Sequence, residues 1–390
     1  MPTSTQMNPQ TILSIWMFLL TAIMILIFST KSFSFLDIQS EKHNHEVNGL
    51  RFFLAIGVAF HHFVYSFNYH SGHGWVVTGY DVNAFMGRFG VAIFFIISGY
   101  LFYNKISIKT DWKLFFIKRF LRIAPMALIS SAICVFIAIS LDDGSFDITK
   151  QIWNIMYWFD AGLYNLRMNV SSVPNASLIN AGVTWTLYWE WAFYFSLPFL
   201  SLLMKDGLRL PVVITIIAAS YYFIPMADYK AGCYAALFAS GFLAKELNFK
   251  SQNQLLINIL PIGLLLFMLY TGSSALSLPL IPLCFAFFVL CNNKNALYGI
   301  FRNKGVTRLG EISYSIYILH GIAWYGLNTF MESTNIIDPW YLFMSSLVLI
   351  STVIICAVTY INVERPCMTL LDRKKQTISS KTENQQVKAL

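Results

Sequence analysis

Eleven apolar segments of the chain are long enough, or nearly so, to cross a lipid bilayer. They run approximately over 11–30, 49–68, 84–104, 123–141, 184–204, 210–226, 231–247, 255–271, 275–291, 309–330 and 340–361. Of the 390 residues, 56% are apolar and 12% are charged, whereas soluble domains carry roughly 25% charged residues. Because backbone polar groups inside a bilayer must be hydrogen-bonded within the chain, we predict an all-α, polytopic membrane helix bundle with about eleven transmembrane helices.

The basic residues predict the orientation of this bundle. If the N-terminus lies outside and the segments alternate, most of the 27 lysines and arginines fall on the inner side, and the exceptions are Arg88, Lys150, Arg167 and Lys230. Such an excess is typical of cytoplasmic loops, so we predict an N-out, C-in topology. The first segment is of span length and no Lys or Arg precedes it, so we expect a retained helix rather than a cleaved signal peptide.

Composition also argues against several classes of function. The net charge of +8 is explained by the cytoplasmic loops, and no basic segment of a soluble domain indicates nucleic-acid binding. None of the cysteines is spaced as in a zinc site, so we expect no metal and treat them as small apolar packing residues. They are Cys134, Cys233, Cys284, Cys291, Cys356 and Cys367.

Two adjacent histidines lie about halfway along the second apolar segment. An ionisable side chain at that depth is costly unless it has a partner or a cavity, so its default interpretation is functional. Arg51 and His62 are eleven residues apart, which places them on one helix face about 16 Å apart along the axis. His61 points about 80° away from Arg51. We therefore predict that His62 and Arg51 are catalytic and that His61 packs.

Basic residues precede the fourth apolar segment on its inner side. Lys118, Arg119 and Arg122 lie in the sequence WKLFFIKRFLRIAP, and the two arginines share a helix face. Guanidinium groups can bind phosphate oxygens in a bidentate manner. The same residues can anchor the helix to lipid headgroups, and spacing alone favours that interpretation.

Two further segments carry polar residues where lipid is expected. Glu190, flanked by tryptophans that include Trp185, lies a turn or two from the outer surface; it suits an acid, a base or a substrate ligand, or a structural ion pair. His320 shares one face of the tenth segment with Tyr317. That face indicates a buried polar channel, although a histidine bonded to a tyrosine is the simpler alternative. Aromatic residues in the outer loop 142–183 suit an interfacial belt better than a sugar site.

Taken together, these motifs resemble the integral membrane acyltransferase family 3, the bacterial sugar O-acyltransferases. The resemblance covers about 49–370, and each motif is weak alone, but their order and spacing are specific. The matching elements are Arg51 with His62, the aromatic stretch Phe94–Tyr100 ending in Ser-Gly-Tyr, Arg119-x-x-Arg122 before Ile123 and Pro125, Trp185–Tyr194 with Glu190, the sequence ISYSIYILH ending in His320, and VERP at Val363–Pro366. The chain departs from the family at Trp191, where a second Glu is common, and at Thr186, where Ser is usual.

The resemblance implies a ten-helix core, so the segment 11–30 is an extra N-terminal helix. We predict three parts: 1–48, that helix and a cytoplasmic linker; 49–371, the acyltransferase domain; and 372–390, a polar tail expected to be disordered. The implied activity is transfer of an acyl group, most often acetyl, from cytoplasmic acyl-CoA to a hydroxyl of an extracytoplasmic glycan or glycolipid. The expected location is the inner, or cytoplasmic, membrane.

The resemblance implies the following roles for the predicted site residues. Arg119, Arg122, Lys118 and Arg51 bind acyl-CoA; His62 is a general base or an acyl-carrying nucleophile; and Glu190, Trp185, Tyr317 and His320 bind or activate the acceptor. The expected partners are membrane lipids, the acyl donor and the saccharide acceptor. A multi-span transporter or flippase for a lipid-linked sugar is the alternative, because many spans with buried polar residues suit it as well. The sequence does not identify the acceptor or the oligomeric state.

Overall fold

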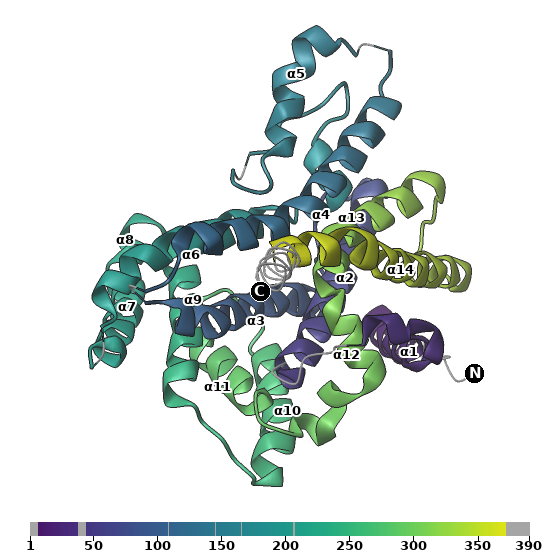
Figure 1. Ribbon diagram of the computed structural model, residues 1–390. Coiled ribbons are helices and arrows are strands. Elements are labelled where there is room, and N and C mark those ends of the chain that lie inside the picture. Colours follow the sequence, from purple (N-terminus) through teal and green to yellow (C-terminus); the bar gives the residue numbers. More distant parts are fainter. Residues whose placement is uncertain are drawn as a thin grey trace, which may run out of the picture.

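The computed structural model describes residues 7–37, 44–107, 109–144, 146–164, 166–205 and 207–371, and the predicted disordered tail 372–390 lies outside them. Over these residues the chain forms α-helices, short 3-10 turns and one π-helical stretch, with no strand. The helices are α1 (Pro9–Ser29), α2 (His45–His70), α3 (Asp81–Phe102), α4 (Trp112–Ser140), α5 (Ile148–Met156), α6 (Trp185–Leu203), α7 (Arg209–Tyr222), α8 (Ile224–Ala227), α9 (Tyr229–Leu247), α10 (Gln254–Tyr270), α11 (Ile281–Cys291), α12 (Lys304–Glu311), α13 (Ser313–Phe330) and α14 (Pro339–Thr359). The predicted helical bundle is therefore confirmed (Figure 1).

Each of the eleven predicted apolar segments contains a helix, although 210–226 is interrupted at Phe223, 309–330 is interrupted at Ile312, and 275–291 is helical only from Leu278. By length and composition alone, six helices within the described residues can cross a membrane, or seven if the bent pair Leu278–Cys291 and Ala296–Arg302 is one span. Helix α13 falls outside this group because it carries polar residues, and most of its side chains are buried within the protein. The protein is thus a multi-pass membrane protein, while the count of eleven and the orientation stay predictions.

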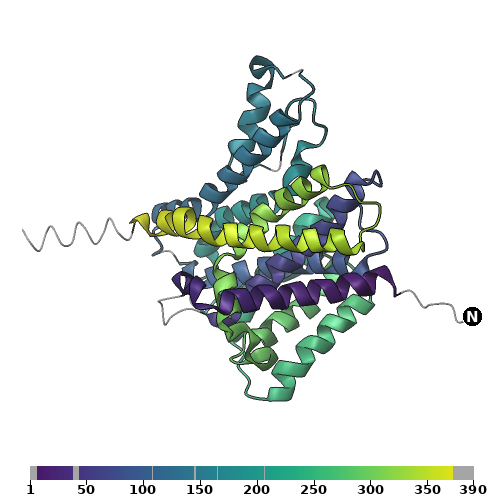
Figure 2. The same ribbon diagram turned by 90° about the vertical axis from the view of Figure 1, so that its right-hand side faces the viewer.

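Helix α2 forms the centre of the bundle. It packs against α3, α12 and α13, and α3 in turn packs against α9. Buried residues occur on every face of α2, which is typical of a helix enclosed by others rather than facing lipid or water. The outer helices α1 and α14 lie nearly parallel in Figure 2, and α1 begins at the end of the bundle opposite to the end where α14 terminates. The central position of α2 puts Arg51 and His62 inside the protein.

Helices α3 and α9 approach each other closely through two glycines. A Cβ atom on Gly99 would overlap the carbonyl oxygen of Phe238, and one on Gly241 would overlap the carbonyl oxygen of Ile96. Small residues allow such backbone contact between membrane helices. The Ser98-Gly99 motif therefore has a packing role, and it holds the cavity-lining face of α3 against the bundle.

Helix α4 begins eleven residues before the predicted apolar segment. Asp111 caps it by accepting a hydrogen bond from the backbone N–H of Leu114 at 2.9 Å. The basic segment is therefore helical and continuous with the span, which fixes Arg119 and Arg122 on a rigid element. At its other end α4 leads to α5, which protrudes from the bundle (Figure 1) and has no buried residue.

Candidate active site

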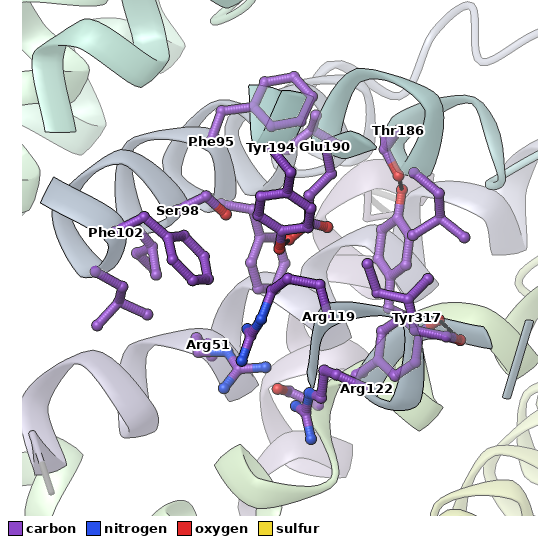
Figure 3. Close-up of a pocket in the computed structure, with 18 of the residues that line it drawn as sticks. Arg51, Phe95, Ser98, Phe102, Arg119, Arg122, Thr186, Glu190, Tyr194 and Tyr317 are labelled. Carbon is purple, nitrogen blue, oxygen red and sulfur yellow. Dashed lines mark hydrogen bonds between the residues drawn. The ribbon is translucent and has the colours of Figure 1, made fainter. Parts of the chain in front are cut away.

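A cavity of about 350 Å³ lies between α2, α3, α4, α6, α12, α13 and the end of α14. We call it the arginine cavity. Its polar lining residues are Arg51, Ser98, Arg119, Arg122, Thr186, Glu190, Tyr194, Glu311, Ser313, Tyr314, Tyr317 and Tyr360, and apolar side chains that include Phe95, Phe102 and Met368 complete it. Figure 3 shows three guanidinium groups gathered on one side, with the carboxylate of Glu190 facing them.

Two of the three arginines have unused hydrogen-bonding capacity. Arg51 enters from the second turn of α2, and among the described residues no hydrogen bond or ion pair reaches its guanidinium. The guanidinium of Arg119 lies 4.9 Å from the ring centroid of Phe102, and its buried Nε has no partner within the described chain. Cations in this state favour an anionic ligand, because desolvated donors without partners are costly.

Arg122 is instead anchored by the last helix. Its Nη1 lies 3.4 Å from Oε2 of Glu364, and it also donates to Sδ of Met368 at 2.9 Å. Glu364 is fully buried, and it accepts a hydrogen bond from the hydroxyl of Ser315. The carboxylate points inward from a π-helical stretch, Tyr360–Glu364, that continues α14. Such single-turn π-helices are frequent at functional sites.

Glu364→Ala is expected to destabilise the protein, because it leaves the half-buried guanidinium of Arg122 without its fully buried counter-charge. Breaking a buried ion pair in this way costs about 3–5 kcal/mol. The measurement is the melting temperature of detergent-purified protein. The matched control is Glu46→Ala, which removes a carboxylate 2.7 Å from the more exposed Arg302 outside the cavity. A melting temperature for Glu364→Ala equal to that of the control would contradict this account of Arg122.

Glu190 lines the same cavity as Arg51 and Arg119. The sequence predicted only that it lies a turn or two from the outer surface, and not that it would share a cavity with the arginines. The reason is that the cavity extends almost to the first turn of α6, where Thr186 also lines it. The hydroxyl of Tyr194, one turn further along α6, donates a hydrogen bond to the Glu190 carboxylate. The acidic and basic groups therefore face one another within one cavity.

Tyr317 links this cavity to a pair of histidines. Its hydroxyl lies 2.8 Å from Oγ1 of Thr186, and its ring packs edge-on against His320 with 6.1 Å between centroids. His320 is fully buried, and its Nε2 lies 2.9 Å from Nδ1 of His62. His62 itself does not line the arginine cavity. The structure thus places His62 behind the cavity wall. Tyr317 belongs to that wall, and the side chain of His320 lies between Tyr317 and His62.

The hydrogen bonds of the histidine pair define the tautomer of His62. Nδ1 of His320 lies 3.0 Å from the carbonyl oxygen of Ile316, and a carbonyl only accepts, so this nitrogen carries the proton. When both rings are neutral, Nε2 of His320 is then an acceptor, and Nδ1 of His62 donates to it. Nε2 of His62 is left with a free lone pair. A histidine oriented by a second group in this way is the arrangement required of a base or nucleophile.

The other predicted residues lie away from the cavity. Trp185 packs against Tyr234 with 5.6 Å between ring centroids and does not line the cavity, and neither does Lys118. His61 is buried, and its Nδ1 lies 2.8 Å from the backbone oxygen of Asn83. No group of three or more potential metal-ligating side chains is found in the described part of the chain.

The sequence reasoning missed several cavity residues. Glu311 lines the cavity and accepts a hydrogen bond from the hydroxyl of Tyr360 at 2.9 Å. Glu311 and Glu364 are charged residues at the edge of an apolar segment, and this was the feature of the sequence that could have identified them as functional. Glu364, which does not line the cavity but pairs with Arg122, enters the sequence prediction only as part of the VERP motif. Tyr194 likewise enters the sequence prediction only as the last residue of the motif Trp185–Tyr194.

Comparison with known proteins gives one match. Residues 44–361 match the model of a family that is described as an acyltransferase domain. The matched region contains the three arginines, Glu190 and both histidines of the pair, and it ends just before Glu364. Neither a curated protein nor a solved structure matches the chain.

Proposed function

Because this chain belongs to acyltransferase family 3, whose model covers 44–361, we propose that it moves an acyl group across a membrane. The donor is cytoplasmic acyl-CoA, most simply acetyl-CoA. The acceptor is a hydroxyl of a glycan or glycolipid on the opposite side of a bacterial cytoplasmic membrane. The observation that carries this proposal is a cavity lined by three arginines, with the oriented His62 behind its wall, where Tyr317 contacts His320 and His320 contacts His62.

The arginines suit the phosphate groups of CoA. Arg51 and Arg119 have donors without partners among the described residues, and charge-assisted bonds to phosphate are strong. Arg122, held by Glu364, presents a third cation at the same place. The volume of about 350 Å³ is at the lower end of the roughly 300–1,000 Å³ typical of small-molecule pockets. We therefore place the thioester arm in the cavity and the nucleotide at its mouth.

His62 then carries the transfer in one of two ways. As a general base, its Nε2 takes the proton of the acceptor hydroxyl, the oxygen attacks the thioester carbonyl, and the C–S bond breaks to release CoA. As a nucleophile, Nε2 attacks the carbonyl first, and the C–S bond breaks to release CoA and leave an acyl-imidazole. The acceptor hydroxyl then attacks this acyl group, the C–N bond breaks, and the hydroxyl proton passes to the freed imidazole. In both routes the thioester approaches past Tyr317, and His320 holds the tautomer that leaves Nε2 free.

A transporter without acyl chemistry was the second candidate. It is not favoured, because the matched family is one of acyltransferases. The oriented histidine beside the cavity also has no evident use in transport alone.

Purified protein incubated with radiolabelled acetyl-CoA and a membrane glycan fraction is expected to release free CoA and to transfer label to the glycan. Release of CoA is followed with a thiol reagent, and transfer by the label retained on extracted glycan. The His62→Ala variant, which lacks the proposed transfer residue, gives the background level of both signals. Movement of a sugar across proteoliposomes, with neither CoA release nor labelled protein or glycan, would overturn the proposal in favour of transport.

A further inference from the structure

A second cavity lies near the opposite end of α2, and we propose that it binds the acceptor as a saccharide carrying an acidic group. We call it the Trp75 pocket. Its volume is about 360 Å³, and its lining includes Tyr65, Trp75, Asp81 and Arg88. The inference rests on the proposed function, because it assigns the acceptor of that reaction.

The position of this pocket is the first argument. It forms where the end of α2, the loop 71–80, the start of α3 and the end of α10 meet. It shares no lining residue with the arginine cavity. Arg51 and Tyr65, one from each, are fourteen residues apart on α2, or about 21 Å along the axis. Donor and acceptor would therefore enter from opposite ends of the bundle.

The row of rings between the two cavities is the second argument. Trp75 lines the pocket, and its ring lies 6.2 Å from that of His62 at an interplanar angle of 29°. His62 contacts His320, and His320 contacts Tyr317 at the wall of the arginine cavity. A hydroxyl bound against Trp75 thus approaches His62 from the side opposite to the thioester.

The chemistry of the lining suits a sugar. Tyr65 and Trp75 lie 5.3 Å apart between ring centroids and form an aromatic wall. Aromatic faces receive the apolar C–H side of a pyranose ring, while hydroxyl and backbone groups nearby bind its edge. The loop that carries Trp75 is held by the side-chain amide of Asn68, which donates to the carbonyl of Val76 at 2.9 Å. The wall is thus built into the fold rather than left on a loose loop.

Arg88 indicates the charge of that sugar. It is exposed, it lines the pocket, and no hydrogen bond or ion pair to another described residue satisfies it. Asp81 also lines the pocket, but an acidic residue in the first turn of α3 is explained by the partial positive charge of the helix N-terminus. Arg88 has no such explanation, and under the predicted topology it is one of few cations on the outer side. Its guanidinium suits a carboxylate or phosphate substituent.

Isothermal titration calorimetry on detergent-purified protein tests this inference with two probes, a glucuronate-containing and a glucose-containing disaccharide. Wild-type protein is expected to bind the acidic disaccharide more tightly. Arg88→Gln is expected to weaken that binding by about tenfold or more, the loss of one charge-assisted contact, and to leave the neutral disaccharide unchanged. The matched control Lys230→Gln, an exposed outer cation outside the pocket, is expected to bind like the wild type.

Three outcomes would overturn the inference: no preference of the wild type for the acidic probe, an equal loss for both probes in Arg88→Gln, or a loss in Lys230→Gln of the same size. A fourth would be weakened binding of Arg88→Gln to phosphatidylglycerol vesicles with unchanged sugar binding, which assigns Arg88 to lipid headgroups. Release of CoA from acetyl-CoA is measured in parallel. It tests the acyltransferase independently, so failure of one assignment is distinguishable from failure of the other.

Discussion

His62→Ala is expected to abolish acyl transfer while the protein is still produced and folded. The substitution removes Nε2, the nitrogen that the hydrogen bond to His320 leaves unprotonated. Loss of a positioned base lowers a rate by about 10²–10⁴-fold, and loss of a nucleophile removes the covalent route altogether. The measurement is the rate of CoA release and of label transfer, with expression and melting temperature recorded beside it. Full activity in this variant would end the proposal.

The matched control is His70→Ala, two turns further along α2. His70 also bonds a backbone carbonyl, that of Ser66, at 2.9 Å, but it lines neither cavity. We expect it to retain near wild-type activity. Incubation of the wild type with labelled acetyl-CoA in the absence of acceptor separates the two routes. Label on the protein that depends on His62 indicates the acyl-imidazole, and its absence indicates general-base catalysis.

Arg51→Gln is expected to raise the KM for acyl-CoA without lowering the melting temperature. Its guanidinium has no hydrogen bond or ion pair to other described residues, so its removal breaks no direct contact. It also removes the repulsion between Arg51 and Arg122, which offsets the lost attraction to the cavity carboxylates. One charge-assisted contact contributes about 1.5–3 kcal/mol, which corresponds to an increase in KM of about 10- to 150-fold. The measurement is the rate of CoA release as a function of acyl-CoA concentration.

Arg302→Gln is the matched control for this prediction. Arg302 forms an ion pair with Glu46 at 2.7 Å, outside the arginine cavity. We expect its loss to affect stability slightly and the KM for acyl-CoA not at all. An unchanged KM in Arg51→Gln, or an equal rise in both variants, would show that Arg51 does not bind the donor.

Helical periodicity and residue depth predicted much of this molecule. All eleven apolar segments contain a helix, because an apolar run of span length has no other way to satisfy its backbone inside a bilayer. Spacing on one helix also related Arg51 to His62. Both inferences concern contacts within a single element, where geometry follows directly from sequence.

Contacts between side chains on different helices could not be predicted from periodicity within one helix. His62 and His320 are far apart in the chain, and their hydrogen bond depends on how α2 packs against α13. The depth of Glu190 depends on the extent of a cavity that seven elements enclose. The inward direction of Glu364 depends on a π-helical stretch that no residue type specifies.

The central position of α2 fixes the distance between two side chains that it carries, Arg51 and His62. Arg51 and His62 are held about 16 Å apart on one buried, uninterrupted helix, so the distance between the proposed phosphate-binding group and the proposed transfer point is fixed. Whether the thioester of a donor reaches His62 then depends on the length of the arm that joins it to the phosphates. Donors with a shortened arm would be bound yet stop short of His62, and selectivity would come from reach as much as from affinity.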